Sequence, residues 1–253
     1  HSHPSGAGLN ELKNVNTNLG SVVRIQAALR DRAAVTPPGE WIVGFMYDDT
    51  KQEEGRPLNR LDLDAVSTDH PIMVGHRGGH TGVYNSRAFG TANVTVNTPD
   101  PFGGHFYREG GELTGKVAES ARGAFTIPRS ATPEERAAGV AAICAKMNES
   151  GLTSVHQAST GSDDLTAYQD ARGAGDLSLR MNLFAGRGLF DQLRPSGVRT
   201  GFGDEWLRIG PVKYAADGSA SERTMAMSTP YAGRPDDLGI LTMTQDEIQE
   251  AVE

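Results

Sequence analysis

The second half of the sequence alternates between predicted helices and predicted strands, and this alternation constrains the fold more than any other feature. A helix is predicted over residues 132–151, where Thr132 and Glu135 have capping-box spacing and Gly151 marks the end. Alternation of strands with helices predicts parallel β/α units, arranged either as a barrel or as an open doubly wound sheet. The predicted strands lie at 152–158, at 177–186 and around Lys213, and the further helices at 163–175, 187–194 and 244–253.

The first half is less regular. Apolar residues at helical spacing predict a helix over 19–35 that ends before a pair of prolines. The proline, glycine and charge content of 97–115 predicts an extended excursion rather than a core element. No glycine-rich nucleotide-binding motif follows a strand, which weakens a nucleotide-binding interpretation. Strands are also predicted at 40–47 and 71–76, and helices at 61–68 and 81–89.

The composition limits the kinds of partner. At 253 residues the chain is long enough for one large domain, a size that α/β barrels routinely reach. Its net charge of −8 argues against nucleic acid or an anionic membrane as the main partner. No apolar run approaches the roughly 18 residues of a membrane span, and the single cysteine, Cys144, excludes an intrachain disulfide. We therefore expect a small-molecule substrate, no nucleic acid and no membrane.

The start of the sequence gives no cellular address. It opens at His1 without a methionine, and no signal peptide can be identified. We expect that a segment is missing upstream, and a cytoplasmic location is the default expectation.

Lys213 lies within the apolar segment PVKYAA, which predicts a buried strand, and the sequence DGS then turns the chain. Three explanations stay open from the residues alone. The side chain could extend along apolar surface so that its charge reaches water. It could be desolvated and act as a base or an amine nucleophile. It could also be converted to a carbamate that bridges two cations, which would need metal ligands nearby.

His1 and His3 flank Ser2 at the start of the chain. Residues two apart in a strand point to the same face, so both imidazoles could bind one ion. Neutral imidazole is a good ligand for zinc and its neighbours. The alternative is that the tripeptide belongs to a tag or a frayed end.

Other histidines follow predicted strands. His156 lies at the carboxyl end of its strand, the end that faces the active site in a β/α barrel, although a structural role is the alternative. His76 and His80 follow another strand, and two glycines between them could present His80 to a cleft, with a surface turn as the alternative.

Several segments together resemble the amidohydrolase superfamily, specifically its family 3 (YtcJ-like) branch. In that branch P-V-K-hydrophobic-x-x-D-G-S is followed by R-T-A and then P-Y, as in PVKYAADGSASERTM and the later PY here. The likeness covers nearly the whole chain, in the family's order. It continues in HSHP, PPGEWIVGF, RPLNRLDLD, RGGHTGVYNSRAF, NTPDPFGGHFYREGGELTGKVAE and GLTSVHQAS.

The resemblance implies a metal-dependent hydrolase on a distorted (β/α)8 TIM-type barrel, with one or two divalent ions, zinc being the expected metal. His1 and His3 match the metal ligands of the first barrel strand. Lys213 matches the bridging position, commonly a carboxylated lysine. His80 resembles a substrate-pocket residue, and the remaining substrate-binding candidates are His156 and Arg223.

The sequence also departs from the family pattern. The family commonly has H-D-A-G where this chain has HQAS at 156–159, and Glu222 stands where a small residue is common. The resemblance places the other metal ligands, the general-base aspartate, the C-terminal barrel strands and a small β-sandwich outside residues 1–253. We therefore expect a partial catalytic barrel with an insertion at about 40–130. Its open sheet edge could be covered by a second copy or a complementing chain segment.

The implied reaction is hydrolysis of a carbon–nitrogen bond in an amide or N-acyl compound through metal-activated water. One alternative is a barrel enzyme that acts on esters or lactones, since metal sites on this fold host varied chemistry. The other is a catalytically inert fragment or binding module derived from the same fold.

Overall fold

The computed structural model describes residues 2–128 and 131–253, and the chain divides into two compact units. Unit 1 comprises His1–Lys13 and Arg129–Tyr214. Unit 2 comprises Asn14–Pro128 and Ala215–Glu253. The expected insertion at about 40–130 falls largely within unit 2.

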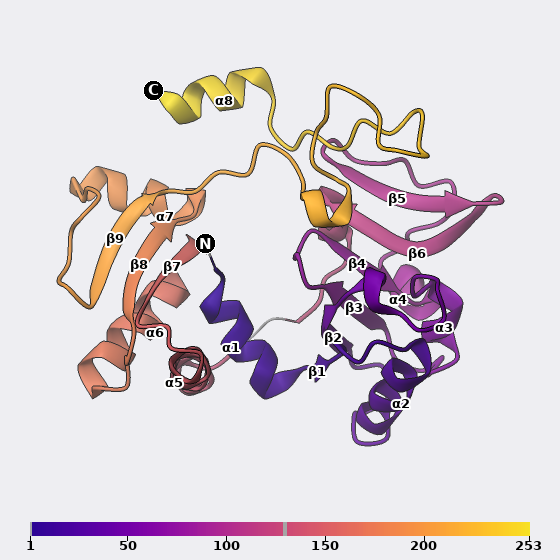
Figure 1. Cartoon of the computed structure of the whole chain (residues 1–253), viewed down its shortest axis with the longest axis horizontal. Helices are drawn as coiled ribbons and strands as arrows, with labels where there is room; N and C mark the ends of the chain where they lie inside the picture. The colour runs from indigo at the N-terminus through magenta and orange to yellow at the C-terminus, as the bar shows by residue number, and fades with distance from the viewer. Residues whose placement is uncertain (1, 129–130) are drawn as a thin grey trace. The chain divides into compact units, whose positions relative to one another are not determined.

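Unit 1 alternates helices with parallel strands (Figure 1). Its elements are α1 (Pro4–Lys13), α5 (Pro133–Glu149), β7 (Ser154–Thr160), α6 (Ser162–Ala174), β8 (Arg180–Ala185), α7 (Arg187–Leu193), η3 (Arg194–Ser196) and β9 (Leu207–Val212). The sheet has the order β7-β8-β9 with parallel pairing throughout. Ser2 forms a parallel bridge with Gln157, so the start of the chain extends this sheet beyond β7. The predicted β/α alternation is therefore confirmed.

Two helices of unit 1, α5 and α6, pack on one face of its sheet. Met181 and Leu183 of β8 are buried against apolar residues of α5 and α6, including Val140 and Tyr168. The predicted capping box of α5 is present, since Thr132 and Glu135 bond each other's backbone N–H groups. Because successive residues of a strand alternate between faces, Asn182 and Phe184 lie on the opposite face of β8.

Unit 2 is built on a mixed sheet with the order β1-β2-β3-β4-β6-β5. Pairing is parallel from β1 to β3 and antiparallel from β3 to β5. Its elements are β1 (Val15–Asn16), α2 (Val22–Ala33), β2 (Ile42–Tyr47), η1 (Asp49–Lys51), α3 (Arg60–Asp64), β3 (Ile72–His76), β4 (Thr81–Tyr84), α4 (Ser86–Thr91), β5 (Gly104–Glu109), β6 (Glu112–Glu119), η2 (Ser120–Ala124), η4 (Ala220–Glu222) and α8 (Gln245–Val252).

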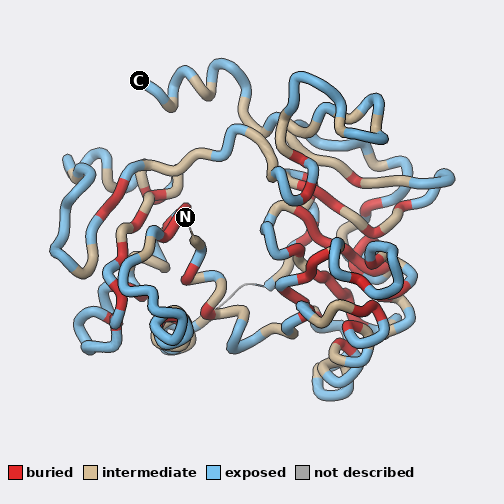
Figure 2. The backbone as a smooth tube through the Cα atoms, viewed as in Figure 1, coloured by how far each residue is buried: buried red, intermediate tan, exposed pale blue. Residues whose placement is uncertain are grey.

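Both faces of the unit 2 sheet carry an apolar cluster, and Figure 2 shows buried residues concentrated along its strands. Ile72 and Val74 of β3 pack with Ile25 and Leu29 of α2. Met73, between them in the sequence, packs in the second cluster with aromatic residues of other elements. This alternation with a period of two explains why β3 could be predicted from a short apolar run.

Two predictions for unit 2 were wrong in part. Residues 97–115 were expected to form an extended excursion, but β5 and β6 form a hairpin in which Phe106 and Val117 are buried. Residues 81–89 were expected to be helical, but β4 occupies their first half and α4 begins at Ser86. In both cases pairing with distant strands outweighs the local glycine content or helical spacing.

Candidate functional site

Two of the residues predicted from the sequence, His3 and Lys213, directly follow backbone segments that pair in the parallel sheet of unit 1. Ser2 is held on β7, because its N–H donates to His156 O at 3.0 Å and its carbonyl accepts from Ala158 N at 2.9 Å. His3 follows directly, and its Nδ1 lies 3.0 Å from Ala158 O. His1 lies outside the described residues.

The hydrogen bond of His3 decides how its imidazole can act. A carbonyl oxygen only accepts, so the contact with Ala158 O places the proton of the neutral ring on Nδ1. The lone pair is then on Nε2, the form in which histidine binds a metal, and metal-bound histidines commonly donate their other ring N–H to a carbonyl. The exposed His3 side chain therefore fits the expected metal site.

Lys213 lies one residue past β9 rather than in the middle of the strand as predicted. Its N–H donates to Ala185 O at 2.8 Å, which continues the pairing of β9 with β8. The side chain is half-buried, and over residues 2–128 and 131–253 its ammonium has no hydrogen-bond or ion-pair partner. Conversion of Lys213 to a carbamate would remove this unpaired positive charge and replace it with an anion that binds metal ions. Lys213 therefore also fits the expected metal site.

His156 lies on the face of β7 that the helices leave uncovered. It pairs in register with Asn182 of β8, and its ring centroid is 5.0 Å from that of Phe184. The His156 side chain is exposed. The prediction that His156 lies at the carboxyl end of its strand is wrong, because β7 continues to Thr160 and His156 is in its first half.

Unit 2 contains a cavity of about 890 Å³, named here the Lys116 cavity. Its walls come from β2, β3, β4, the β5–β6 hairpin and the turn around Arg223. The lining combines aromatic side chains with an unusual density of charged ones. The charged and titratable residues are Asp49, Arg56, His76, Arg108, Glu109, Lys116, Glu222, Arg223, Arg234 and Asp237.

Glu222 anchors the turn that carries Arg223. Its side chain is buried and accepts hydrogen bonds from the N–H of His80 at 3.1 Å and from both the N–H and the hydroxyl of Thr81 at 2.5 Å. Burial raises the pKa of Glu222, but its hydrogen bonds with His76 and Thr81 outweigh burial and lower it overall. Sequence reasoning noted Glu222 only as a departure from the family pattern. Its anchoring role depends on contacts with residues more than 140 positions away.

Two histidines of unit 2, His76 and His80, have carboxylate partners. Burial lowers the pKa of His76, but hydrogen bonds to Asp49 and Glu222 raise it to about 9. The Glu119 carboxylate, 2.8 Å from His80 Nδ1, raises the pKa of His80. His80 does not line the Lys116 cavity among its described walls, and it contributes through its backbone N–H to Glu222.

Asp48, Asp49 and His76 form a second group with ligand atoms within 4.8 Å of one another. Its members already have partners. Thr50 donates to Asp48 Oδ1 and lowers the pKa of Asp48 to about 2, and Arg77 Nε lies 2.8 Å from Asp48 Oδ2. A metal ion would also have to displace the proton that Asp49 stabilises on His76. The group could hold a metal, but it fits less well than His3.

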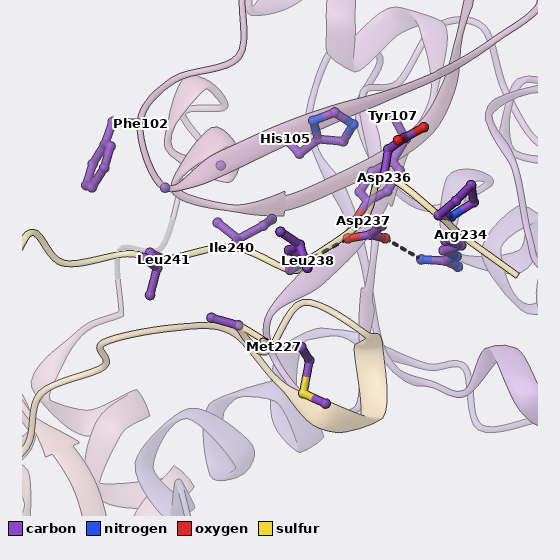
Figure 3. A pocket seen from close by; sticks show the side chains of 15 residues that line it. Phe102, His105, Tyr107, Met227, Arg234, Asp236, Asp237, Leu238, Ile240 and Leu241 are labelled. Carbon is purple, nitrogen blue, oxygen red and sulfur yellow. Dashed lines mark hydrogen bonds and ion pairs between the residues drawn. The ribbon is translucent and has the colours of Figure 1, made fainter. Parts of the chain in front are cut away.

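A second cavity in unit 2, the Phe102 cavity, has a volume of about 880 Å³ (Figure 3). Its lining is mostly apolar, with Phe102 on one side and Leu238, Ile240 and Leu241 on another. Tyr107, Arg234 and Asp237 line both cavities, and the Arg234–Asp237 ion pair of 3.1 Å is drawn as a dashed line in Figure 3. The cavities therefore adjoin at this ion pair.

A comparison with known families assigns the chain. The profile of the amidohydrolase family matches residues 1–253. The chain belongs to the amidohydrolase family. The resemblance inferred from the sequence motifs is confirmed over the whole chain.

Individual relatives within the amidohydrolase family are distant. A Bacillus subtilis (strain 168) protein, YtcJ, named as an amidohydrolase, is 26% identical over 95% of this chain and 46% of its own length. The N-substituted formamide deformylase of Arthrobacter pascens is 28% identical over 64% of this chain and 31% of its own length. This amidohydrolase chain thus spans about half the length of YtcJ and less of the deformylase.

Solved structures agree on the fold. An uncharacterized metal-dependent hydrolase from Pyrococcus furiosus has a TM-score of 0.60 at 26% identity, over all of this chain and 50% of the other. A second, from Pyrococcus horikoshii OT3, has a TM-score of 0.64 at 24% identity, over all of this chain and 49% of the other. The mixed α/β fold is therefore that of metal-dependent hydrolases. Of the helices in the described ranges, none has the length and apolar character needed to cross a membrane.

Proposed function

We propose that this protein is a metal-dependent hydrolase that cleaves a carbon–nitrogen bond in an amide or N-acyl compound. The observation that carries the proposal is the family match over residues 1–253. The relatives' names, an amidohydrolase and a deformylase of N-substituted formamides, support the choice of this bond over an ester or lactone.

The proposed fold around the site is a (β/α)8 barrel. The parallel order β7-β8-β9, the bridge from Ser2 and the helices on one face support a (β/α)8 barrel of which this chain holds a part. In such a barrel the uncovered face of β7 and β8 would point inward, and the strand ends that carry His3 and Lys213 would face the substrate.

We assign His3 and Lys213, with His1, as the residues that would hold one or two divalent ions, with zinc the expected metal. A bound ion would lower the pKa of a coordinated water towards about 7 and polarise the substrate carbonyl. The contact between His3 and Ala158 O would keep Nε2 oriented as a ligand. His156 is a proposed substrate contact in unit 1, while His80 and Arg223, predicted from the sequence as substrate contacts, belong to unit 2 and stay predictions.

Lys213 is proposed to act as a carbamate. Its neutral amine adds to carbon dioxide, a new N–C bond forms, and one proton is released to solvent. The product carries two carboxylate oxygens in place of the ammonium. The half-buried position of Lys213 supports this change, because an anion with bound metals replaces an uncompensated cation.

The test measures zinc content and hydrolysis in the complete purified protein. N-butylformamide is compared with butyl formate, which differs only in the bond cleaved. We expect the formamide to be the better substrate. The Lys213→Met variant should contain less zinc per protein molecule than wild type, and its kcat/KM should be lower by about 100-fold or more. Arg199→Met, at an exposed position between η3 and β9, is the control and should change neither. Activity that persists after complete metal removal, or hydrolysis of the ester alone, would overturn the proposal.

A further inference from the structure

We propose that the Lys116 cavity of unit 2 binds a small organic carboxylate with an apolar body, and that Lys116 and Arg223 hold its carboxylate. This binding site is argued from unit 2 alone and does not depend on the proposed hydrolysis.

The first observation is the position of Lys116. It lies on β6 between Gly115 and Val117, both of which are buried, and its Nζ sits 4.8 Å from the ring centroid of Tyr107. No carboxylate pairs with this ammonium in the part of the chain that the structure describes. Burial lowers the pKa of Lys116 overall. The nearby carboxylates of Asp49 and Glu222 raise it, and the guanidinium groups of Arg234 and Arg223 oppose them. Positive side chains therefore converge on one cavity, which favours an anion there.

The second observation is the backbone of Arg223. Its φ of 56° and ψ of 44° place it in the left-handed region, which a side chain with a Cβ disfavours. The residues on both sides hold it there, because Glu222 is bonded to Thr81 and Thr224 Oγ1 donates to Glu119 Oε1. Arg223 itself is exposed, and across the described ranges its guanidinium has no ion-pair partner. The fold thus holds Arg223 in a disfavoured backbone conformation, and the nearby Asp49 carboxylate acts on its guanidinium without an ion pair.

The remaining charges of the cavity are largely accounted for by their own partners. Asp49 pairs with His76, and Arg234 pairs with Asp237. Arg56 forms a bidentate pair with Asp62, and Arg108 pairs with Asp100. Glu109 is exposed at the end of the β5–β6 hairpin, where water screens it. Lys116 and Arg223 are left as the charges available to a ligand.

The uncharged side chains of the cavity favour a ligand whose remaining part is apolar. Tyr47, Leu58, Val83 and Tyr107 give the cavity an apolar and aromatic lining. Its volume of about 890 Å³ lies in the range of small-molecule sites. A guanidinium and an ammonium beside aromatic walls suit an aryl or alkyl carboxylate better than inorganic phosphate, which has no apolar part.

The experiment titrates the complete protein with benzoate by isothermal titration calorimetry. Benzamide has the same ring and shape without the charge, and inorganic phosphate has charge without the ring. We expect benzoate to saturate one site below about 10 mM, with benzamide and phosphate each bound at least about tenfold more weakly. Lys116→Met and Arg223→Asn should each weaken benzoate by about tenfold or more, asparagine being chosen because it tolerates the left-handed region. Arg87→Gln, on an exposed position of α4 away from the cavity, should leave binding unchanged.

Each other outcome contradicts the proposal. Equal binding of benzamide would show that the carboxylate is not recognised, and equal binding of phosphate would show that the apolar walls are not used. Unchanged binding in folded Lys116→Met would remove the assignment even if Arg223→Asn fails to fold. Because calorimetry of benzoate involves no turnover, its result is separate from that of the hydrolysis test.

Discussion

Thr224 Oγ1 donates a hydrogen bond of 2.6 Å to Glu119 Oε1 across 105 residues of sequence. The same carboxylate lies 2.8 Å from His80 Nδ1, and the same hydroxyl accepts from Ser219 N at 2.9 Å. Glu119 thus joins the end of β6, the start of β4 and the Arg223 turn. The contact therefore helps to hold the backbone at Arg223.

Replacing Thr224 by valine should destabilise the protein by about 1–3 kcal/mol, because Thr224 is fully buried and its loss leaves Ser219 N and Glu119 short of a partner. The free energy of unfolding in urea measures the effect. Thr91→Val, which removes an exposed hydroxyl bonded within α4, should stay within about 0.5 kcal/mol of wild type. Equal losses in the two variants would contradict the special role of Thr224.

Replacing Glu222 by alanine should cost about 3–5 kcal/mol, because the buried imidazole of His76 loses one of its acids and the N–H groups of His80 and Thr81 lose their acceptor. The control is Glu112→Ala, whose side chain is 77% exposed, where about 0–1 kcal/mol is expected. Urea unfolding of both variants, with benzoate binding as a second measurement, checks the prediction. A small effect at Glu222 would mean that the turn is held by other contacts.

Glu54 should make stability depend on pH in a defined range. Hydrogen bonds from Val22 N and the Ser21 hydroxyl at the start of α2 lower the pKa of Glu54 from 4.5 to about 2. Because the folded-state pKa is depressed, the stabilisation is present above about pH 4.5 and is lost as the pH falls towards 2. Thermal unfolding of wild type and Glu54→Gln should therefore differ most above pH 4.5 and converge near pH 2. A constant difference between the two proteins across this range would contradict the assignment.

The next prediction concerns the close packing of α1 against α5. A Cβ at Gly8 of α1 would overlap the backbone carbonyl of Gly139 in α5, whereas a Cβ at Gly6 would meet open space. Gly8→Ala should therefore cost about 1–3 kcal/mol and loosen the segment that positions His3, while Gly6→Ala should be neutral or stabilising. Zinc retention during dialysis and thermal unfolding measure both effects. Unchanged zinc retention in Gly8→Ala would show that α1 does not position His3.

The sequence predicts best where structure is local. The capping box at Thr132 and Glu135, and the alternation from α5 to β9, follow from spacing within a few residues, and all of them are present. The β5–β6 hairpin was missed because its glycines and charges resemble a loop, and only pairing with β4 and burial of Phe106 make it a core element.

The candidate site shows the same limit. His3 and Lys213 could be singled out because each belongs to a short motif. Lys116 and Glu222 could not, since their surroundings come from segments far apart in the sequence, as in the contact between Glu222 and Thr81. A charged residue in a strand with alternating apolar neighbours, as at Lys116, is the signal that could have found it.

The most direct test of the proposed metal site is anomalous X-ray scattering at the zinc edge from crystals of the complete protein. We predict a peak about 2.0–2.1 Å from His3 Nε2, with additional density on Lys213 Nζ that corresponds to a carbamate. A plain lysine at position 213 and no peak at His3, or a peak only at Asp48, Asp49 and His76, would contradict the account.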